Sequence, residues 1–328
     1  MLHTAVLRRR LVVTSFALAL LAACSPVRRD TSGAGANDPY VVVLGTAQDG
    51  GIPHAACSCP HCKAARTDPA RHRDVASLAI FVPSSGQRFL VDATPDLRTQ
   101  LTRLPDAPGH AAGKVDRHPV DGVLLTHAHI GHYLGLAFFG FEAIHTSRLP
   151  VYATPRMAEF VRGNAPWSRL VAREEIELRV TPPATSFELA EGVRVTPFAV
   201  PHRDEDSDTV GYAIEGPHHA VAYVPDTDGW AAWSEEALGI VARCDTLLVD
   251  GTFFAAGELP GRDVAKIGHP LMVDTMDRLG FRVRDGSLRV LFTHLNHSNA
   301  ALDPAGPERR ALKARGFAIA EDGQHLPL

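Results

Sequence analysis

The stretch THAHIGH, residues 126–132, places three histidines within six positions, directly after the apolar run DGVLL, residues 121–125. Alternation along a strand that ends near Thr126 puts His127 and His129 on the same side, and His132 follows where the chain turns toward a helix. Neutral imidazole is the commonest protein ligand for zinc and also suits iron. A helix terminus with surface histidines is the alternative, but three histidines at this spacing after a buried strand favour a metal site.

The rest of the chain alternates short apolar runs with glycine or proline breaks and a few helical stretches. The predicted strands are YVVVLG (40–45), SLAIFVP (77–83), RFLVDA (88–93), GVLLTH (122–127), VRVTPFAV (193–200), VGYAIEG (210–216), AVAYVPD (220–226), TLLVDG (246–251) and RVLFTH (289–294). Helical patterns cover residues 95–104, the segment after His132, and residues 156–163, 234–244 and 271–280. Several strands end on a residue that can bind a metal, which indicates one functional rim of a layered α/β scaffold: Asp92, His127, Asp226, Asp250 and His294.

The composition is that of a globular protein, with 328 residues, 45% hydrophobic and 21% charged. The N-terminus differs, because MLHTAVLRRR (1–10) is basic and LVVTSFALALLAA (11–23) is apolar but short for a membrane span. This pattern predicts a signal peptide over residues 1–23. Its removal takes away three arginines and no acid, which changes the formal net charge from −4 to −7. Nucleic acid is therefore not an expected partner.

The segment LAAC, residues 21–24, resembles the bacterial lipobox, in which the cysteine is lipidated and becomes the mature N-terminus. The resemblance implies that Cys24 carries a lipid anchor; ordinary cleavage nearby, which would leave a free cysteine, is the alternative. Residues 24–39 are polar and rich in Gly, Ser and Pro, which suits a flexible tether. We therefore expect an exported lipoprotein, anchored in the membrane on its periplasmic side, with a folded domain over residues 40–328.

The segment HAHIGH, residues 127–132, resembles the H-x-H-x-D-H signature of the metallo-β-lactamase superfamily. Four further stretches follow that superfamily's order: FLVDA (89–93), VPHRDEDSDTVGYAI (200–214), AVAYVPDTDG (220–229) and VLFTHLNH (290–297). The resemblance implies an α/β fold with four layers in the order αββα. It also implies the ligands of a catalytic metal centre, which are His127, His129, His132, His202, Asp226 and His294.

Gly131 departs from this signature, because it stands where the superfamily has an aspartate that binds the second metal. Three histidines and Asp226 remain for the first metal. The second metal keeps only His132, His294 and the shared Asp226. We therefore expect the first position to bind more tightly and the second to be weak, unless another acid such as Asp228 or Asp250 reaches it.

The stretch HAACSCPHC, residues 54–62, carries Cys57, Cys59 and Cys62, and Cys244 follows much later. In an exported protein the default for such cysteines is a disulfide. Neighbouring C-x-C and C-x-x-C pairs make strained or redox-type bridges, however, and three crowded thiols suit a closed zinc site that lacks one ligand. Both interpretations stay open, with structural zinc favoured.

The segment GTAQDGGIPHAACSCPHCKAAR, residues 45–66, resembles two branches of the superfamily: the coenzyme PQQ synthesis protein B family and the cyclic phosphodiesterase PhnP. In the phosphodiesterase branch, a histidine three residues after the last catalytic-metal ligand completes a structural zinc site. The resemblance implies that His297 does so here, with Cys57, Cys59 and Cys62. His269 in KIGHP resembles by position that branch's active-site histidine that is not a ligand; a histidine in a surface loop is the alternative.

A metal with three protein ligands and an open position lowers the pKa of bound water from 15.7 to about 7. The favoured function is therefore a metal-dependent hydrolase that uses metal-bound hydroxide on an ester or phosphodiester of a small-molecule substrate. Asp226 and His269 are the predicted catalytic residues, and His269 is the acid for the leaving group. The expected metals are one or two catalytic zinc ions, or manganese or iron, and one structural zinc. A redox role in cofactor maturation, as in the PQQ branch, and a non-catalytic metal-binding lipoprotein are the alternatives.

Overall fold

The computed structural model describes residue 35 and residues 37–106, 115–259, 261–262 and 267–328. The predicted signal peptide, Cys24 and most of the predicted tether lie outside these residues. The lipid anchor therefore stays a prediction, which the mass of the mature N-terminus would test. Across the described residues, no helix is both long enough and apolar enough to cross a membrane.

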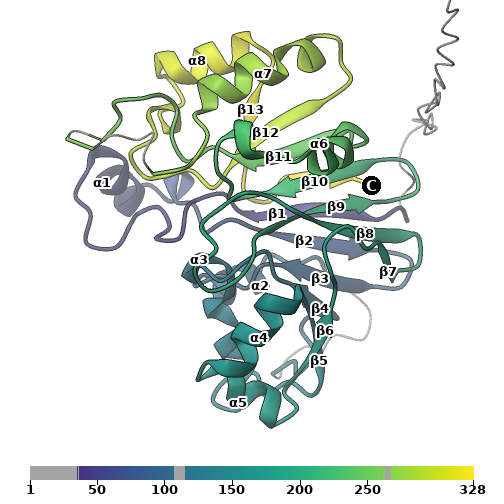
Figure 1. Ribbon diagram of the computed structural model, residues 1–328. Helices are drawn as coiled ribbons and strands as arrows, with labels where there is room; N and C mark the ends of the chain where they lie inside the picture. The colour runs from purple at the N-terminus through teal and green to yellow at the C-terminus, as the bar shows by residue number, and fades with distance from the viewer. Residues whose placement is uncertain (1–34, 36, 107–114, 260, 263–266) are drawn as a thin grey trace, which may run out of the picture.

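Two stacked β-sheets form the centre of the molecule (Figure 1). Within the described residues each sheet has seven strands. The first sheet contains, in spatial order, β14 (His325–Pro327), β1 (Tyr40–Gly45), β2 (Ser77–Val82), β3 (Gln87–Val91), β4 (Gly122–Leu124), β5 (Leu149–Ala153) and β6 (Ile176–Val180). The second contains β13 (Ala318–Ile319), β12 (Arg289–Thr293), β11 (Thr246–Asp250), β10 (Ala220–Val224), β9 (Val210–Glu215), β8 (Val193–Ala199) and β7 (Phe187–Ala190).

Both sheets are mixed, and the parallel part of each leads to the functional rim. Strands β3 to β6 run parallel in the first sheet, and β10 to β13 run parallel in the second. Parallel sheets are covered on both faces, so their central strands are almost continuously apolar. Every residue of β10, which pairs parallel with β11, is buried, which explains why AVAYV lacks polar alternation. Every residue of the antiparallel strand β2 is buried as well, because one of its faces lies between the sheets and the other under a helical layer.

Helices cover the outer face of each sheet, which completes the four αββα layers that the sequence predicts (Figure 1). Separate apolar clusters fill the space between the sheets and the space under each helical layer. The first sheet is covered by α2 (Leu97–Leu101), α3 (Ile130–Tyr133), α4 (Pro155–Gly163) and α5 (Trp167–Ala172). The second is covered by α6 (Glu235–Ala242), α7 (Met272–Arg284) and α8 (Pro307–Ala314). Helix α1 (Pro60–Thr67) lies at one edge of the sheets.

The predicted functional rim is present at this edge. Asp92 and His127 follow β3 and β4 of the first sheet, while Asp226, Asp250 and His294 end or follow β10, β11 and β12 of the second. The carboxyl ends of neighbouring parallel strands lie at one edge, so loops from both sheets meet there. The fold thus brings together residues that are far apart in the sequence.

Candidate metal centres

Three histidines surround one oxygen of Asp226 at the rim. The Oδ2 atom of Asp226 lies 3.3 Å from His127 Nε2, 3.1 Å from His202 Nε2 and 3.6 Å from His129 Nδ1. The four ligand atoms all lie within 4.8 Å of one another. This group, which we call the first position, contains the predicted set His127, His129, His202 and Asp226.

Two of the three histidine rings in the first position have a side-chain partner on the ring nitrogen that faces away from Asp226. Thr126 Oγ1 lies 3.0 Å from His127 Nδ1, and Asp228 Oδ1 lies 3.1 Å from His202 Nδ1. A partner on one ring nitrogen aims the other at a metal and sets the tautomer. Burial, and then the neighbouring His132, hold the pKa of His127 well below its ordinary value. His127 is therefore neutral, as a ligand has to be.

A second group lies beside the first and contains Asp49, His132 and His294, whose ligand atoms again lie within 4.8 Å of one another. Asp92 Oδ2 holds His132 Nδ1 at 2.7 Å, and Thr252 Oγ1 lies 3.0 Å from His294 Nδ1. Both rings are fully buried, yet among the described residues neither Nε2 has a hydrogen-bond partner. We call this group the second position.

Asp92, at the end of its strand, holds neighbouring residues of the site in position. Its carboxylate accepts hydrogen bonds from the backbone N–H and the hydroxyl of Thr126 and also contacts His132 Nδ1. Asp92 and His294 both have a positive φ, 68° and 58°. Such backbone strain in residues other than glycine gathers at functional sites.

His269 is buried beside both positions, so the alternative of a surface-loop histidine is wrong. Its Nδ1 lies 2.7 Å from Asp250 Oδ2 and 3.3 Å from Asp226 Oδ1. Burial lowers the pKa of His269, but Asp250 and then Asp226 outweigh this effect and raise it to about 9. A protonated imidazole at this place can donate a proton to a leaving group.

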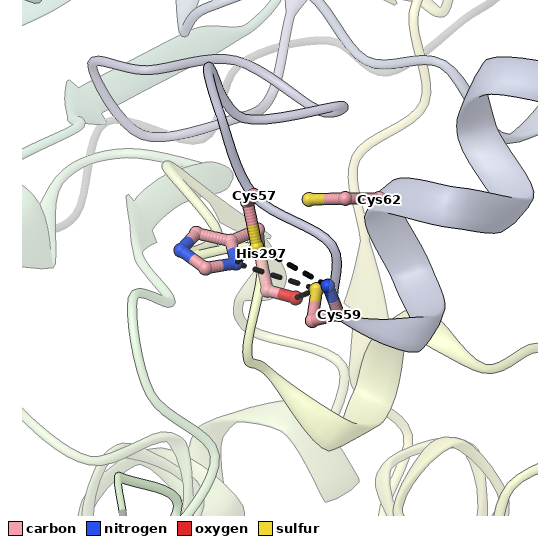
Figure 2. A group of neighbouring side chains, drawn as sticks. All are labelled: Cys57, Cys59, Cys62 and His297. Atoms are coloured by element: carbon pink, nitrogen blue, oxygen red, sulfur yellow. Dashed lines mark hydrogen bonds between the residues drawn. The ribbon is translucent and has the colours of Figure 1, made fainter.

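A separate cluster lies at α1 (Figure 2). The thiols of Cys57, Cys59 and Cys62 and the ring of His297 point toward one another, with all four ligand atoms within 4.8 Å. His297 Nδ1 lies 3.4 Å from Cys57 Sγ and 3.5 Å from Cys59 Sγ. The three thiols are free. Three sulfurs and one imidazole nitrogen make a ligand set typical of a closed structural zinc site.

Comparison with known proteins agrees with this geometry. Residues 87–294 match the family described as the beta-lactamase superfamily domain. The chain belongs to this superfamily. Coenzyme PQQ synthesis protein B of Methylobacterium sp. (strain 4-46) is 30% identical over 310 residues, which cover 88% of this chain and 99% of that relative. The same protein of Xanthomonas campestris pv. campestris (strain B100) is 28% identical over 316 residues, which cover 88% of this chain and 99% of that relative.

Solved structures of the superfamily share the fold. Zinc-bound PqqB from Methylobacterium extorquens has a TM-score of 0.74 at 28% identity and covers 88% of this chain and 100% of its own. A diphosphatase from the PhnP family has a TM-score of 0.63 at 21% identity and covers 88% of this chain and 97% of its own. The second likeness supports the four-layered fold alone.

The superfamily site in this chain contains one acid that the sequence analysis overlooked. Asp49, in the loop after β1, lies next to Gly131, the departure from the superfamily signature. Of the two acids that the sequence suggested for the missing carboxylate, Asp228 contacts His202. Asp250 contacts His269 and, with Asp226, His269 and His294, forms a further group whose ligand atoms lie within 4.8 Å of one another. The expectation for the second position left room for another acid but did not name Asp49, and the strength of metal binding there stays a prediction.

Solvent reaches the superfamily site from the side of His129. The side chain of His129 is 18% exposed and that of Asp49 is 29% exposed, whereas the predicted ligands other than His129 are almost fully buried. The exposed Arg203 guanidinium lies 3.3 Å from His129 Nε2. The open side therefore carries a cation, Arg203, beside a ligand, and the exposed carboxylate of Glu205 lies 3.9 Å from both groups. An anionic oxygen of a substrate can bind to Arg203 in place of Glu205.

Proposed function

We propose that the chain is a metal-dependent hydrolase of ester or phosphodiester type, acting on a small molecule. The observation that carries the proposal is the arrangement of three imidazole nitrogens around Asp226 Oδ2, with solvent access at His129. A zinc, manganese or iron ion held there would polarise the substrate and make water nucleophilic at neutral pH. The histidine cluster fits such an ion, because the buried Nε2 atoms of His127, His132 and His294 have no hydrogen-bond partner among the described residues.

The protein residues would bind and orient the reactants. Arg203 would attract an anionic substrate oxygen at the open side, and Asp228 and Thr126 would keep two ligand rings in place. His269 would donate a proton to the departing oxygen, because Asp250 holds its Nδ1 and leaves the other ring nitrogen for the substrate. The negative charge of Asp250 stabilises the protonated ring before the transfer.

His269→Gln is expected to lower kcat by about a hundredfold or more, as loss of a general acid does. The loss should be larger for a substrate with an alkoxide leaving group than for one that releases p-nitrophenolate, which needs little protonation. Steady-state kinetics with both substrates measure the difference. Equal losses for the two leaving groups, or a loss of bound metal, would contradict the role of acid.

Hydrolysis itself is tested with bis(p-nitrophenyl) phosphate and a set of p-nitrophenyl esters, using purified full-length protein loaded with zinc, manganese or iron. We expect turnover of at least one class above the rate of a His127→Ala variant, which lacks a ligand of the first position. A well-folded, metal-loaded protein that hydrolyses none of them faster than this variant would contradict the proposal for these substrate classes.

A role like that of the coenzyme PQQ synthesis proteins is the second candidate. It is favoured by 30% identity along almost the whole length of the Methylobacterium relative. Expression of this chain in a bacterium that lacks its own coenzyme PQQ synthesis protein B separates the two candidates. Restored coenzyme formation supports the second, whereas hydrolysis in vitro without restoration supports the first.

A further inference from the structure

The second position contains the carboxylate of Asp49, which comes from the loop after β1 and not from the signature segment. Gly131 lies in α3, and a Cβ built on it would overlap Asp49 Oδ1 and lie 2.9 Å from Asp49 Cα and 3.0 Å from Asp49 Cγ. The space that the side chain of residue 131 would need is thus already filled by Asp49.

The backbone of Gly131 does not itself require glycine. Its φ is not among the positive values of the described chain, and α3 is an ordinary helical turn that any small residue can adopt. The absence of a side chain is therefore explained by space rather than by conformation. A residue with a Cβ at position 131 would push Asp49 away from His132.

The Asp49 carboxylate points at the unpartnered histidine nitrogens. Its Oδ1 atom lies 3.7 Å from His132 Nε2 and, like the Nε2 atoms of His132 and His294, is buried without a hydrogen-bond partner among the described residues. Two ligands of a tetrahedral zinc, each about 2.0–2.1 Å from the ion, lie about 3.3 Å apart. The observed separation is close to this value and too long for a hydrogen bond.

The loop that carries Asp49 is fixed to the strand end that carries His294. Gln48 N–H donates to Leu295 O at 2.9 Å, and Leu295 N–H donates to Thr46 O at 2.8 Å. Ala47 also forms a parallel bridge with Leu295. These backbone bonds hold Asp49 in register with His294, so the carboxylate is placed by the fold and not by a freely moving loop.

We propose that Asp49 is a metal ligand of the second position and replaces the signature aspartate whose place Gly131 occupies. The second position then has two imidazoles and one carboxylate of its own, together with the shared Asp226, whose Oδ2 lies 3.8 Å from His294 Nε2. The inference rests on metal binding by the proposed site, but it does not depend on which reaction follows. With Asp49 as a ligand, the second position no longer has too few ligands for a two-metal site.

The direct test locates the metals by anomalous scattering at the zinc edge in crystals of the zinc-loaded full chain. The wild-type protein should show a peak among Asp49, His132 and His294, and a second peak at the first position. Asp49→Asn should lose the first of these peaks, with at least a tenfold weaker affinity for that zinc, and should keep the peak at the first position. The exposed Asp277→Asn is the matched control and should keep both.

A relocated carboxylate completes the test. Gly131→Asp alone should not increase zinc binding, because the new side chain meets Asp49, whereas Asp49→Gly combined with Gly131→Asp should restore the lost peak. The inference is overturned if Asp49→Asn keeps the peak, if the wild type lacks it, or if Gly131→Asp alone binds an additional zinc. Absence of zinc from the first position as well would overturn the proposed function. If folded Asp49→Asn keeps the zinc of the first position, the loss of zinc from the second position is a local effect of the substitution and not a consequence of misfolding.

Discussion

Asp226→Asn is expected to weaken metal binding at both positions and to lower hydrolysis on the order of a thousandfold. Asp226 is the residue that the two positions share, because its Oδ2 contacts Nε2 of His127 and His202 and faces His294. The amide keeps the size of the side chain but removes the charge that offsets two cations. Metal content and kcat/KM, measured on the same preparation, should fall together.

Asp228→Asn is the control for this prediction, because its effect on metal binding and activity should be smaller than that of Asp226→Asn. Asp228 contacts His202 Nδ1 from outside the group and does not face the proposed ion itself. Loss of such a supporting partner typically costs 10–100-fold in metal affinity or activity. Equal effects of the two variants would show that Asp226 only supports the ring positions, and would contradict its role as a shared ligand.

His297→Ala is expected to release about one zinc per chain and to lower the free energy of unfolding by about 3 kcal/mol or more, because binding energy at a closed zinc site is folding energy. For a domain of this size a loss of about 3 kcal/mol corresponds to a fall in Tm of roughly 5 °C. His297 is the residue that ties α1 and its preceding loop to the segment after β12 (Figure 2). Elemental analysis and calorimetry measure the two effects.

His61→Ala is the matched control, since His61 lies beside Cys62 in α1 but is not in the ligand group. It should keep the zinc and most of the stability. The competing interpretation of the cluster is a disulfide. Mass spectrometry that finds a disulfide among Cys57, Cys59 and Cys62 in native protein, with no zinc to lose in His297→Ala, would decide against the zinc site.

The central strands could be predicted from the sequence because burial on both faces leaves a clear signal. All nine predicted strands correspond to strands of the structure, including β2 and β10 with every residue buried. The strands that sequence reasoning missed lie mostly at sheet ends. β6 has a buried residue only at its start, and β13 and β14 have two and three residues. Short or half-exposed strands carry too little hydrophobic pattern, and their positions depend on neighbours that the sequence does not name.

The lengths of two predicted helices differ from those in the structure. The pattern over residues 95–104 becomes a helix only at Leu97–Leu101, and the predicted helix after His132 is one turn of α3 followed by a 3₁₀ segment over Leu134–Phe139. Gly135 in that segment packs directly against the backbone oxygens of Ala93 and Thr94. Tertiary packing against the end of β3 therefore sets the local shape here, and propensity alone does not contain that information.

A local sequence pattern predicts some of the candidate metal ligands but not Asp49. The spacing of His127, His129 and His132 is a local feature, so the sequence predicts their convergence. Asp49 meets Gly131 only because the first sheet brings the loop after β1 and the start of α3 to the same rim, and no local pattern reports that contact. A signal was available, because Asp49 is an acid in the glycine-rich loop after a predicted strand, and other strand ends at this rim carry ligands.

The most direct test of the account is a metal titration of the metal-free full chain, in which zinc, manganese or iron bound at the histidine cluster and the rate of ester or phosphodiester hydrolysis are measured on the same samples. The account predicts that the rate starts at the background of the His127→Ala variant and rises with occupancy of the cluster. His297→Ala alters only the cysteine cluster. At a temperature where this variant is folded, its rate of hydrolysis should therefore rise to a final value per folded chain similar to that of the wild type. A rate that stays at background while the histidine cluster fills with each metal, or hydrolysis that is complete before any metal is added, would contradict the account.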